Sequence, residues 1–316
     1  MTDSSDNVQL PARRAFLRKM SATAASGLAL GAVARADDPP AENAKLPTIK
    51  LGKYDVTRLV AGWNPIGGHS HTTLNMARVM REYFTVEQTA QFLLDCEQHG
   101  INTWQYDHTE KGVAALRLAR EKGSKIQPIC LHAERSLDAP LKQVIEEAKP
   151  IAIVHHGGVT DAMFRAGRSH VVRNFVKLAK DQGLVVGVSS HCPDNIKQIA
   201  DEGWENDFFL TCFYYVSRPR EEQEETMGKV IVGEPFLQSD PEEMTAVVRQ
   251  VDKPCLGFKI LAAGRLGWSR FAVEKAFKFA FANIKPTDGV IVGIFPKYYD
   301  EIADNAKYTL KHGADA

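Results

Sequence analysis

Histidine side chains follow several of the short apolar runs in this sequence. The chain has ten histidines, and seven of them end such a run or lie in the loop after the first one. These seven are His69, His71, His108, His132, His155, His156 and His191. Histidine exchanges protons near neutral pH and binds divalent metals, and either role needs several polar groups in one pocket. The pattern therefore predicts a site for proton transfer or for a metal ion.

The metal alternative depends on residues from four separate runs. The candidate ligands are Asp107, His132, His156 (or its neighbour His155) and His191. Imidazole and carboxylate groups together suit zinc or manganese. A local ligand motif such as H-E-x-x-H is absent from the sequence, and the H-x-H pair at His69 and His71 lies in a glycine-rich loop. Metal binding therefore stays open as an alternative to metal-free acid–base chemistry.

The elements that carry these residues alternate regularly along the chain. Near-continuous apolar runs, typical of parallel strands buried on both faces, occupy residues 57–63, 103–107, 126–132, 151–156, 185–191, 208–215, 254–261 and 289–294. Segments with a period near 3.6, typical of helices, occupy 85–100, 111–123, 136–149, 169–183, 192–203, 239–250, 270–285 and 298–313. This α/β alternation predicts a (β/α)₈ TIM barrel, in which chemistry sits at the carboxyl ends of the strands. A doubly wound open sheet is the rival fold, but no glycine-rich phosphate loop follows the first strand.

Two segments fall outside the repeat. Residues 47–56 hold two short alternating runs around Leu51-Gly52-Lys53, and we predict an N-terminal β-hairpin that closes the bottom of the barrel. Residues 217–239 form a long insertion after the sixth strand. We expect its acidic first half to be solvated and its second half to fold over the site as a lid.

Composition limits the classes of partner. The 316 residues include 39 basic and 39 acidic side chains, so no net charge attracts nucleic acid or an anionic membrane. A small-molecule substrate is the expected partner. The five cysteines are dispersed and lack any C-x-x-C pair, which favours buried thiols over a disulfide framework or a zinc ribbon.

The N-terminus carries an export pattern. Arg13 and Arg14 precede a short run rich in alanine and glycine, and residues 34–36 (Ala-Arg-Ala) fit a cleavage motif. The pattern resembles a bacterial twin-arginine signal peptide, whose pathway exports folded proteins. We expect a signal peptide at 1–36, a linker at 37–46 and the barrel at 47–316. The resemblance implies the twin-arginine export machinery as a partner, a periplasmic mature protein and no stable membrane anchor after cleavage.

Four stretches resemble segments of the aldo/keto reductases, in order along the barrel. They are LGKYDVTRLVAGWNPIGG (51–68), GLVVGVSSH (183–191), GFKILAAGRL (257–266) and VGIFPKYYDEIADNAKY (292–308). The resemblance implies a (β/α)₈ barrel that reduces carbonyls with NADP(H). The cofactor residues it implies are Ser189, Ser190, Tyr214, Lys259, Lys297 and Asn305, with Tyr214 stacking on the nicotinamide.

The catalytic tetrad of that family is largely missing. The family places Asp on the second strand, Tyr just after it, Lys at the end of the third strand and His at the end of the fourth. Here Gln105 replaces the Asp, no Tyr stands at 109–111 and no Lys at 130–132, while His155 or His156 matches the histidine. Tyr106 or His108 is then a substitute acid, and His132 or Lys259 a source of neighbouring charge.

Three functions are compatible with this pattern. The first is an exported, NADP-dependent oxidoreductase of the aldo/keto reductase type that acts on a small carbonyl or sugar-like substrate with a non-standard tetrad. The second is a metal-dependent lyase, isomerase or hydrolase that uses the His and Asp residues at the strand ends. The third is a catalytically inactive binding module.

Overall fold

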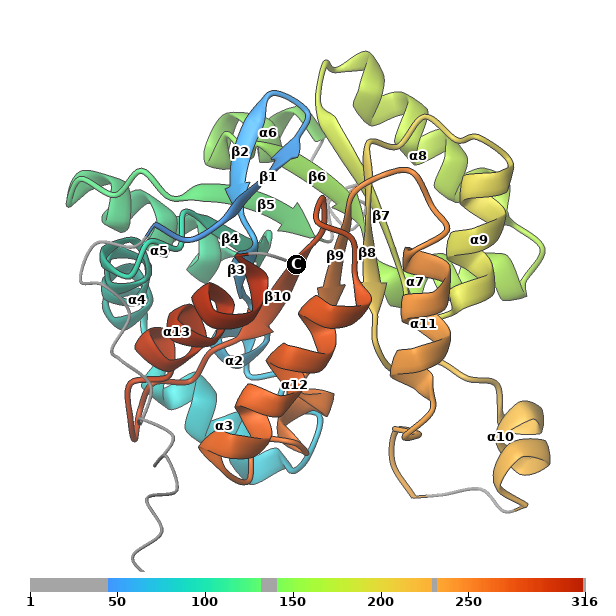
Figure 1. Cartoon of the computed structure of the whole chain (residues 1–316). Helices are drawn as coiled ribbons and strands as arrows, with labels where there is room; N and C mark the ends of the chain where they lie inside the picture. Colours follow the sequence, from blue (N-terminus) through green and yellow to red (C-terminus); the bar gives the residue numbers. More distant parts are fainter. Residues whose placement is uncertain (1–44, 132–140, 229–231, 315–316) are drawn as a thin grey trace, which may run out of the picture. The chain divides into compact units, whose positions relative to one another are not determined.

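The computed structural model describes residues 45–131, 141–228 and 232–314. Eight parallel strands close into a barrel in the order β10-β3-β4-β5-β6-β7-β8-β9 (Figure 1). The strands are β3 (Leu59–Gly62), β4 (Thr103–Asp107), β5 (Gln127–Leu131), β6 (Ala152–His155), β7 (Val185–Ser190), β8 (Phe208–Cys212), β9 (Cys255–Phe258) and β10 (Gly289–Gly293). The predicted (β/α)₈ barrel is thereby confirmed. The predicted signal peptide, most of the predicted linker and His132 lie outside the described residues.

All eight predicted helical segments contain a helix. They are α4 (Val86–Gln98), α5 (Glu110–Glu121), α6 (Leu141–Ala148), α8 (Ser169–Asp181), α9 (Pro193–Asp201), α11 (Asp240–Val248), α12 (Arg270–Asn283) and α13 (Glu301–Gly313). Thr85 caps α4 by accepting a hydrogen bond from the Gln88 amide, as its residue type favours. Further helices that the periodicity did not reveal are α2 (Asn64–Gly67), α3 (Leu74–Tyr83), α7 (Gly157–Arg165), α10 (Arg220–Met227) and the 3₁₀ turn η2 (Ala262–Gly264).

Alternation along each strand decides which side chains face the barrel interior. Val60, Ile129, Val154 and Leu210 pack together inside the barrel, whereas residues one position away pack against the surrounding helices. Interior packing is tight, because a Cβ at Gly187 would lie 2.6 Å from the ring of Phe208. The same alternation sorts the polar residues at the strand ends into inward and outward sets.

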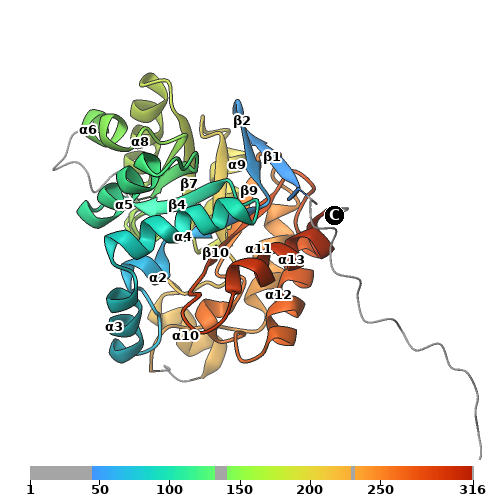
Figure 2. The same cartoon turned by 90° about the vertical axis from the view of Figure 1, so that its left-hand side faces the viewer.

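The amino-terminal end of the barrel is closed by the predicted hairpin. β1 (Thr48–Leu51) pairs antiparallel with β2 (Tyr54–Thr57), and their apolar residues join the interior cluster of the barrel. Figures 1 and 2 both show this hairpin at the end of the barrel opposite α3. Beside it, the buried guanidinium of Arg58 donates to the carbonyls of Asp288 (2.7 Å), Gly313 (2.7 Å) and Lys285 (3.1 Å). Arg58 thus ties the first barrel strand to both ends of the last βα unit.

The insertion after β8 divides as its composition predicts. The acidic α10 has no buried residue, which agrees with a solvated first half. In the second half, Glu234 and Phe236 contact residues of other loops at the carboxyl end of the barrel. In the described part of the chain, no helix has the length and apolar character needed to cross a membrane.

Candidate active site

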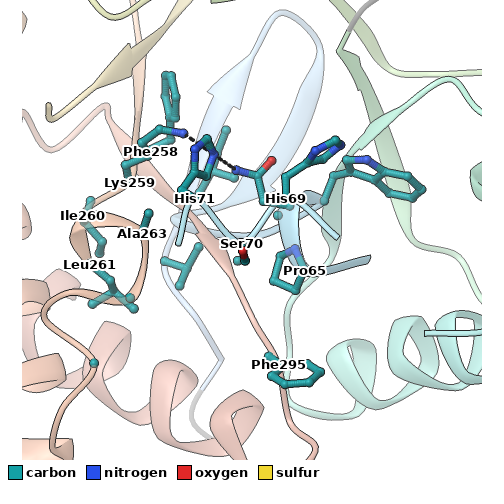
Figure 3. Close-up of a pocket in the computed structure, with 18 of the residues that line it drawn as sticks. Pro65, His69, Ser70, His71, Phe258, Lys259, Ile260, Leu261, Ala263 and Phe295 are labelled. Carbon is teal, nitrogen blue, oxygen red and sulfur yellow. Dashed lines mark hydrogen bonds between the residues drawn. The ribbon is translucent and has the colours of Figure 1, made fainter. Parts of the chain in front are cut away.

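A cavity of about 740 Å³ opens at the carboxyl ends of the strands. Its floor includes the last inward-facing residues of β4 and β7 together with His156, which follows β6, and its walls come from the loops after β3, β9 and β10. Figure 3 shows residues of the β3 loop (Pro65 to His71) and of the β9 loop (Phe258 to Ala263) around this space. The cavity therefore occupies the position at which TIM-barrel enzymes carry their chemistry.

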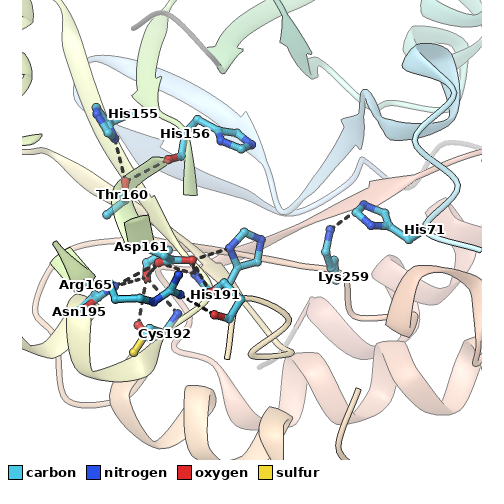
Figure 4. Close-up of polar contacts among 12 residues, drawn as sticks. His71, His155, His156, Thr160, Asp161, Arg165, His191, Cys192, Asn195 and Lys259 are labelled. Atoms are coloured by element: carbon cyan, nitrogen blue, oxygen red, sulfur yellow. Dashed lines mark hydrogen bonds and ion pairs between the residues drawn. The ribbon is translucent and has the colours of Figure 1, made fainter. Parts of the chain in front are cut away.

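His191, just after β7, lines the cavity and is held by a buried carboxylate. Its Nδ1 lies 2.8 Å from Oδ2 of Asp161 in α7, which is 3% exposed. An ionised carboxylate only accepts hydrogen bonds, so Nδ1 carries a proton and donates it to Asp161. The ring packs edge-on against Phe258, with centroids 5.5 Å apart, and Figure 4 shows it pointing from the Asp161 cluster toward the side of Lys259 and His71. Nε2 of His191 is thus available to a ligand in the cavity.

Asp161 is kept ionised by a shell of donors. Ser190 Oγ donates at 2.5 Å, Ser217 Oγ at 2.7 Å and Asn195 Nδ2 at 3.1 Å. Burial by itself raises the pKa of Asp161, but the hydrogen bonds and charge of His191, together with the two serines, outweigh burial and hold that pKa below its usual value. The pair is therefore a carboxylate that orients an imidazole, an arrangement that sets the tautomer of a catalytic histidine.

A second polar cluster ties the mouth of the cavity together. His71 Nδ1 lies 2.9 Å from the carboxylate of Glu234, while its Nε2 lies 3.0 Å from Lys259 Nζ and 3.2 Å from Asn64 Nδ2. Lysine and the amide nitrogen only donate, so Nε2 accepts and Nδ1 donates to Glu234. The cluster joins the β3 loop, the insertion and the end of β9.

The backbone at this mouth is held in unusual conformations. His71, Lys259, Ala262 and Ala263 have φ between 48° and 58°, in the left-handed region that residues with a Cβ rarely adopt. Three of them line the cavity. Such backbone conformations concentrate at functional sites, where surrounding contacts hold them in place.

The floor of the cavity presents polar groups to a ligand. Gln105 and Ser189 are 6% and 2% exposed, and His156 lies beside them. Nε2 of Gln105 has no hydrogen-bond partner among the described residues. Asp107, also on the floor, lies 4.0 Å from Nε2 of His69. A buried donor without a partner costs stability. The unpartnered Nε2 of Gln105 in the cavity therefore indicates a group placed for a ligand.

The far end of the cavity lies against α12, α13 and the loop after β10. Glu301 accepts a hydrogen bond from the Phe295 amide (2.8 Å), and Asp304 pairs with Arg270 (2.9 Å). Asn305 is 3% exposed and lines the cavity, and its side-chain amide has no hydrogen-bond partner within the described ranges. This end therefore combines two carboxylates, one cation and one buried amide.

The structure brings half of the sequence candidates into the cavity. Those lining it are Asp107, His156, Ser189, His191, Lys259 and Asn305. Those elsewhere are Tyr106, His108, His155, Ser190, Tyr214 and Lys297. His132 falls in residues 132–140, outside the described part of the chain.

The candidates outside the cavity have structural surroundings of their own. Tyr106 points outward and stacks on Trp104 with centroids 5.0 Å apart, and burial raises its pKa far above the ordinary value. His155 also points outward, to Thr160 (2.8 Å), and burial lowers its pKa to about 4. His108 binds Glu147 at 2.9 Å.

The cofactor candidates outside the cavity are likewise engaged elsewhere. Ser190 is committed to Asp161, Tyr214 packs on Phe236, and the ammonium of Lys297 lies over the ring of Tyr298. These placements follow from strand alternation and from loop paths that the sequence does not display.

Sequence reasoning missed Asp161, Glu234 and Glu301. Asp161 lies six residues after His155, in a helix that the apolar pattern did not reveal, and its proximity to His191 arises from the neighbouring β6 and β7. Glu234 was counted within the insertion without a role. Concerning the metal alternative, no group of three or more His, Cys, Asp or Glu side chains arranged to hold a metal ion occurs among residues 45–131, 141–228 and 232–314. All five cysteines are buried with free thiols.

Comparisons with known proteins give likenesses of structure. No protein-family profile matches the sequence, and no curated protein matches it either. The apo form of Gox0644 is 12% identical, with 83% of this chain and 87% of that chain covered and a TM-score of 0.50. The glycerol dehydrogenase AKR11B4 from Gluconobacter oxydans is 11% identical over 84% of this chain and 90% of that one (TM-score 0.49). The aldo-keto reductase AKR11C1 from Bacillus halodurans is 11% identical over 86% and 97% (TM-score 0.47). At such identities the likeness is one of barrel fold, and the chemistry rests on the residues of this cavity.

Proposed function

We propose that this chain is an oxidoreductase of the aldo/keto reductase type that interconverts a carbonyl and a hydroxyl group on a small, sugar-like substrate. The observation that carries the proposal is the His191–Asp161 pair at the cavity wall. It gives the cavity a proton donor and acceptor although the Tyr and Lys of the family pattern are missing from the sequence.

His191 moves the substrate proton through Nε2. With Nδ1–H directed to Asp161, the neutral ring accepts the hydroxyl proton when an alcohol is oxidised. In the reverse direction the imidazolium returns that proton to the carbonyl oxygen. Asp161 is a positioning residue: it fixes the tautomer and its negative charge stabilises the imidazolium. A nicotinamide cofactor supplies or removes the hydride when it is bound.

Residues along the cavity fit a nicotinamide dinucleotide. Trp63 and Phe258 offer aromatic surfaces near the floor, and the Ser189 hydroxyl lies there to bind a carboxamide. At the far end, the unpartnered amide of Asn305 suits an adenine ring, whose N6 and N7 form a donor–acceptor pair that asparagine matches. The cofactor would thus lie between the floor and α13, with Lys259 lining the wall between them.

Polar groups on the floor fit a hydroxylated substrate. The Gln105 amide has a donor without a partner among the described residues, and His156 and Asp107 line the same space. A sugar-like molecule presents several hydroxyls that both donate and accept, so it would accept from Gln105 while contacting His156 and Asp107. A purely apolar carbonyl compound would leave Gln105 unsatisfied, at a cost of about 1–3 kcal/mol.

The test begins with cofactor binding by the purified protein. NADH and NADPH are titrated separately while the enhancement of nicotinamide fluorescence is followed, and a panel of polyols, aldoses and small aldehydes is then assayed at 340 nm for turnover. We expect saturable binding of a nicotinamide dinucleotide and turnover of polyhydroxylated substrates.

His191→Gln and His108→Gln form a matched pair for the catalytic assignment. His191→Gln should lower kcat about 10²–10⁴-fold, the usual worth of a general acid–base, with little change in dinucleotide affinity. His108→Gln should leave kcat unchanged, because His108 binds Glu147 and does not line the cavity. Absence of any dinucleotide binding, or full activity in His191→Gln, overturns the proposal.

We also propose that the protein works in the periplasm after twin-arginine export. The proposal is supported by Arg13, Arg14 and the alanine-rich run that follows them. The double change Arg13→Lys, Arg14→Lys should retain the precursor in the cytoplasm, as measured by fractionation and by the size of the mature chain. Unchanged export of the double variant contradicts it.

A further inference from the structure

The far end of the cavity is poor in free positive charge. Among the described lining residues at this end, Arg270 is the cation, and its Nε pairs with Asp304 at 2.9 Å while its guanidinium lies over the ring of Tyr299. Lys297, which the sequence suggested for a phosphate, does not line the cavity. A phosphate bound here would have to replace Asp304 as the partner of Arg270. The carboxylate of Asp304 would then lie beside the phosphate without its cation.

Glu301 makes the same end unfavourable for added negative charge. Its Oε2 accepts the Phe295 amide at 2.8 Å, and the residue lines the cavity. Burial raises the pKa of Glu301 to about 7, although the Phe295 amide and Tyr299 act in the opposite direction. This environment already resists a single negative charge, and the 2′-phosphate that distinguishes NADP from NAD brings nearly two more.

Asn305 shows that the same end is nevertheless built for a ligand. Its side chain is 3% exposed, lines the cavity and has no hydrogen-bond partner within the part of the chain that the structure describes. A mostly buried amide that lines a cavity is placed to exchange hydrogen bonds with a ligand in that cavity. The adjacent acceptor, Glu301, matches ribose hydroxyls, as acidic residues do in other NAD sites.

We infer that the cavity selects NAD(H) over NADP(H), with Glu301 accepting from the ribose hydroxyls and Asn305 binding the adenine. This inference rests on the proposed function, because it names the dinucleotide of the same site. It departs from the family resemblance, which implies NADP. Glu301 and Asp304 act together here, since both carboxylates would lie beside a 2′-phosphate.

Binding calorimetry on the full-length mature protein tests the inference without turnover. The probes are NAD⁺, NADP⁺, and the fragments ADP-ribose and its 2′-phosphorylated form, which differ by the one phosphate. We expect NAD⁺ and ADP-ribose to bind at least about 30-fold more tightly than their phosphorylated counterparts, because a like-charge contact costs several kcal/mol. The preference should weaken as the salt concentration is raised about tenfold, because screening reduces the repulsion.

Variants at position 301 assign the preference to its carboxylate. Glu301→Gln retains an acceptor for the Phe295 amide and should reduce the NAD⁺/NADP⁺ affinity ratio about tenfold. Glu301→Arg should bring the ratio to one or below, and Glu121→Arg on the exposed surface of α5 controls for a general change of charge. Asn305→Leu should weaken both dinucleotides equally. Thermal denaturation confirms that each variant is folded.

The outcomes separate this inference from the proposed function. Equal or tighter binding of NADP⁺ by the unaltered protein overturns the NAD preference and leaves the oxidoreductase proposal standing. An unchanged affinity ratio in Glu301→Arg overturns the role of Glu301. Failure of both dinucleotides to bind overturns the proposed function and this inference with it.

Discussion

Buried polar side chains differ in their hydrogen bonding between the two ends of the barrel. At the amino-terminal end, Arg58 is buried and its donors meet the carbonyls of three residues, with the hairpin packed beside it. At the carboxyl end, Nε2 of Gln105 is buried without a partner among the described residues, and the backbone at Lys259 is left-handed. The buried Arg58 is bonded to the segments that it joins, whereas the buried donor of Gln105 is left for a ligand in the cavity.

The same contrast separates two adjacent histidines. His155 faces outward, packs edge-on against Phe175 and bonds Thr160, while His156 lines the cavity. One residue along a strand reverses the direction of a side chain. A histidine at a strand end is therefore structural or functional according to its place in the alternation.

The largest stability effect should come from the amino-terminal end. Arg58→Met should lower the free energy of unfolding by about 3 kcal/mol, because several buried carbonyls lose their donor together. Urea denaturation measures the change, and dinucleotide binding should be preserved. Arg117→Met, on an exposed face of α5, is the matched control. If the free energy of unfolding fell by less than about 1 kcal/mol, Arg58 would not be what holds this end of the barrel together.

Acid should destabilise the fold through His155. Burial places its pKa at about 4 in the folded protein, below the usual 6.5, so the unfolded chain takes up the proton first as pH falls. The contribution of the neutral His155 ring to the free energy of unfolding is complete above pH 6.5 and is lost as pH falls toward 4. Between pH 7.5 and 5 the free energy of unfolding should therefore fall by about 2 kcal/mol. His155→Gln should abolish this part of the pH dependence of urea unfolding, and His108→Gln should not. If the free energy of unfolding changed equally with pH in both variants, groups other than His155 would control the acid sensitivity.

A change at the carboxyl end should have the opposite sign. Gln105→Met removes a buried donor that has no partner among the described residues, so it should raise the free energy of unfolding by about 1 kcal/mol while lowering turnover. Gln127→Met is the control at the other end of the barrel, where the amide donates to the Asp55 carbonyl at 2.8 Å, and it should be destabilising. Destabilisation by both substitutions would contradict the contrast between the ends.

The smallest effect concerns the backbone of the cavity mouth. Ala263 has φ of 51°, and Ala263→Gly should raise the melting temperature slightly, by an amount equivalent to about 0.5 kcal/mol, because glycine adopts this conformation without strain. Ala162→Gly, at an exposed position of α7, should lower the melting temperature by an amount equivalent to about 1 kcal/mol. Equal losses in both variants would show that the left-handed backbone stores no strain.

The barrel was predictable because apolar runs and helical periods are local features of the sequence. The hairpin at 47–56 was predicted for the same reason. The site was predictable only in part. The strands were located correctly, but β8 ends at Cys212 and β9 at Phe258, each three residues before its predicted end. In addition, Tyr106 and His155 face the helical layer.

The missing part of the site depends on contacts between segments distant in sequence. Asp161 reaches His191 from the helix that follows the neighbouring strand, over thirty positions of sequence. Glu234 reaches His71 from the insertion, over 163 positions. Neither contact has a local sequence pattern, so neither follows from periodicity or motif spacing.

The contact of His71 with Lys259 and Glu234 has a consequence for access to the cavity. Burial alone would raise the pKa of Glu234, but the hydrogen bond and charge of His71, with Lys259 and Arg265 nearby, keep it below the usual value. Moving the β3 loop outward would withdraw His71 from both charged partners at once. Ligand exchange by that route and the loss of both hydrogen bonds of His71 are therefore a single event, and its rate should depend on the strength of this cluster as well as on ligand size.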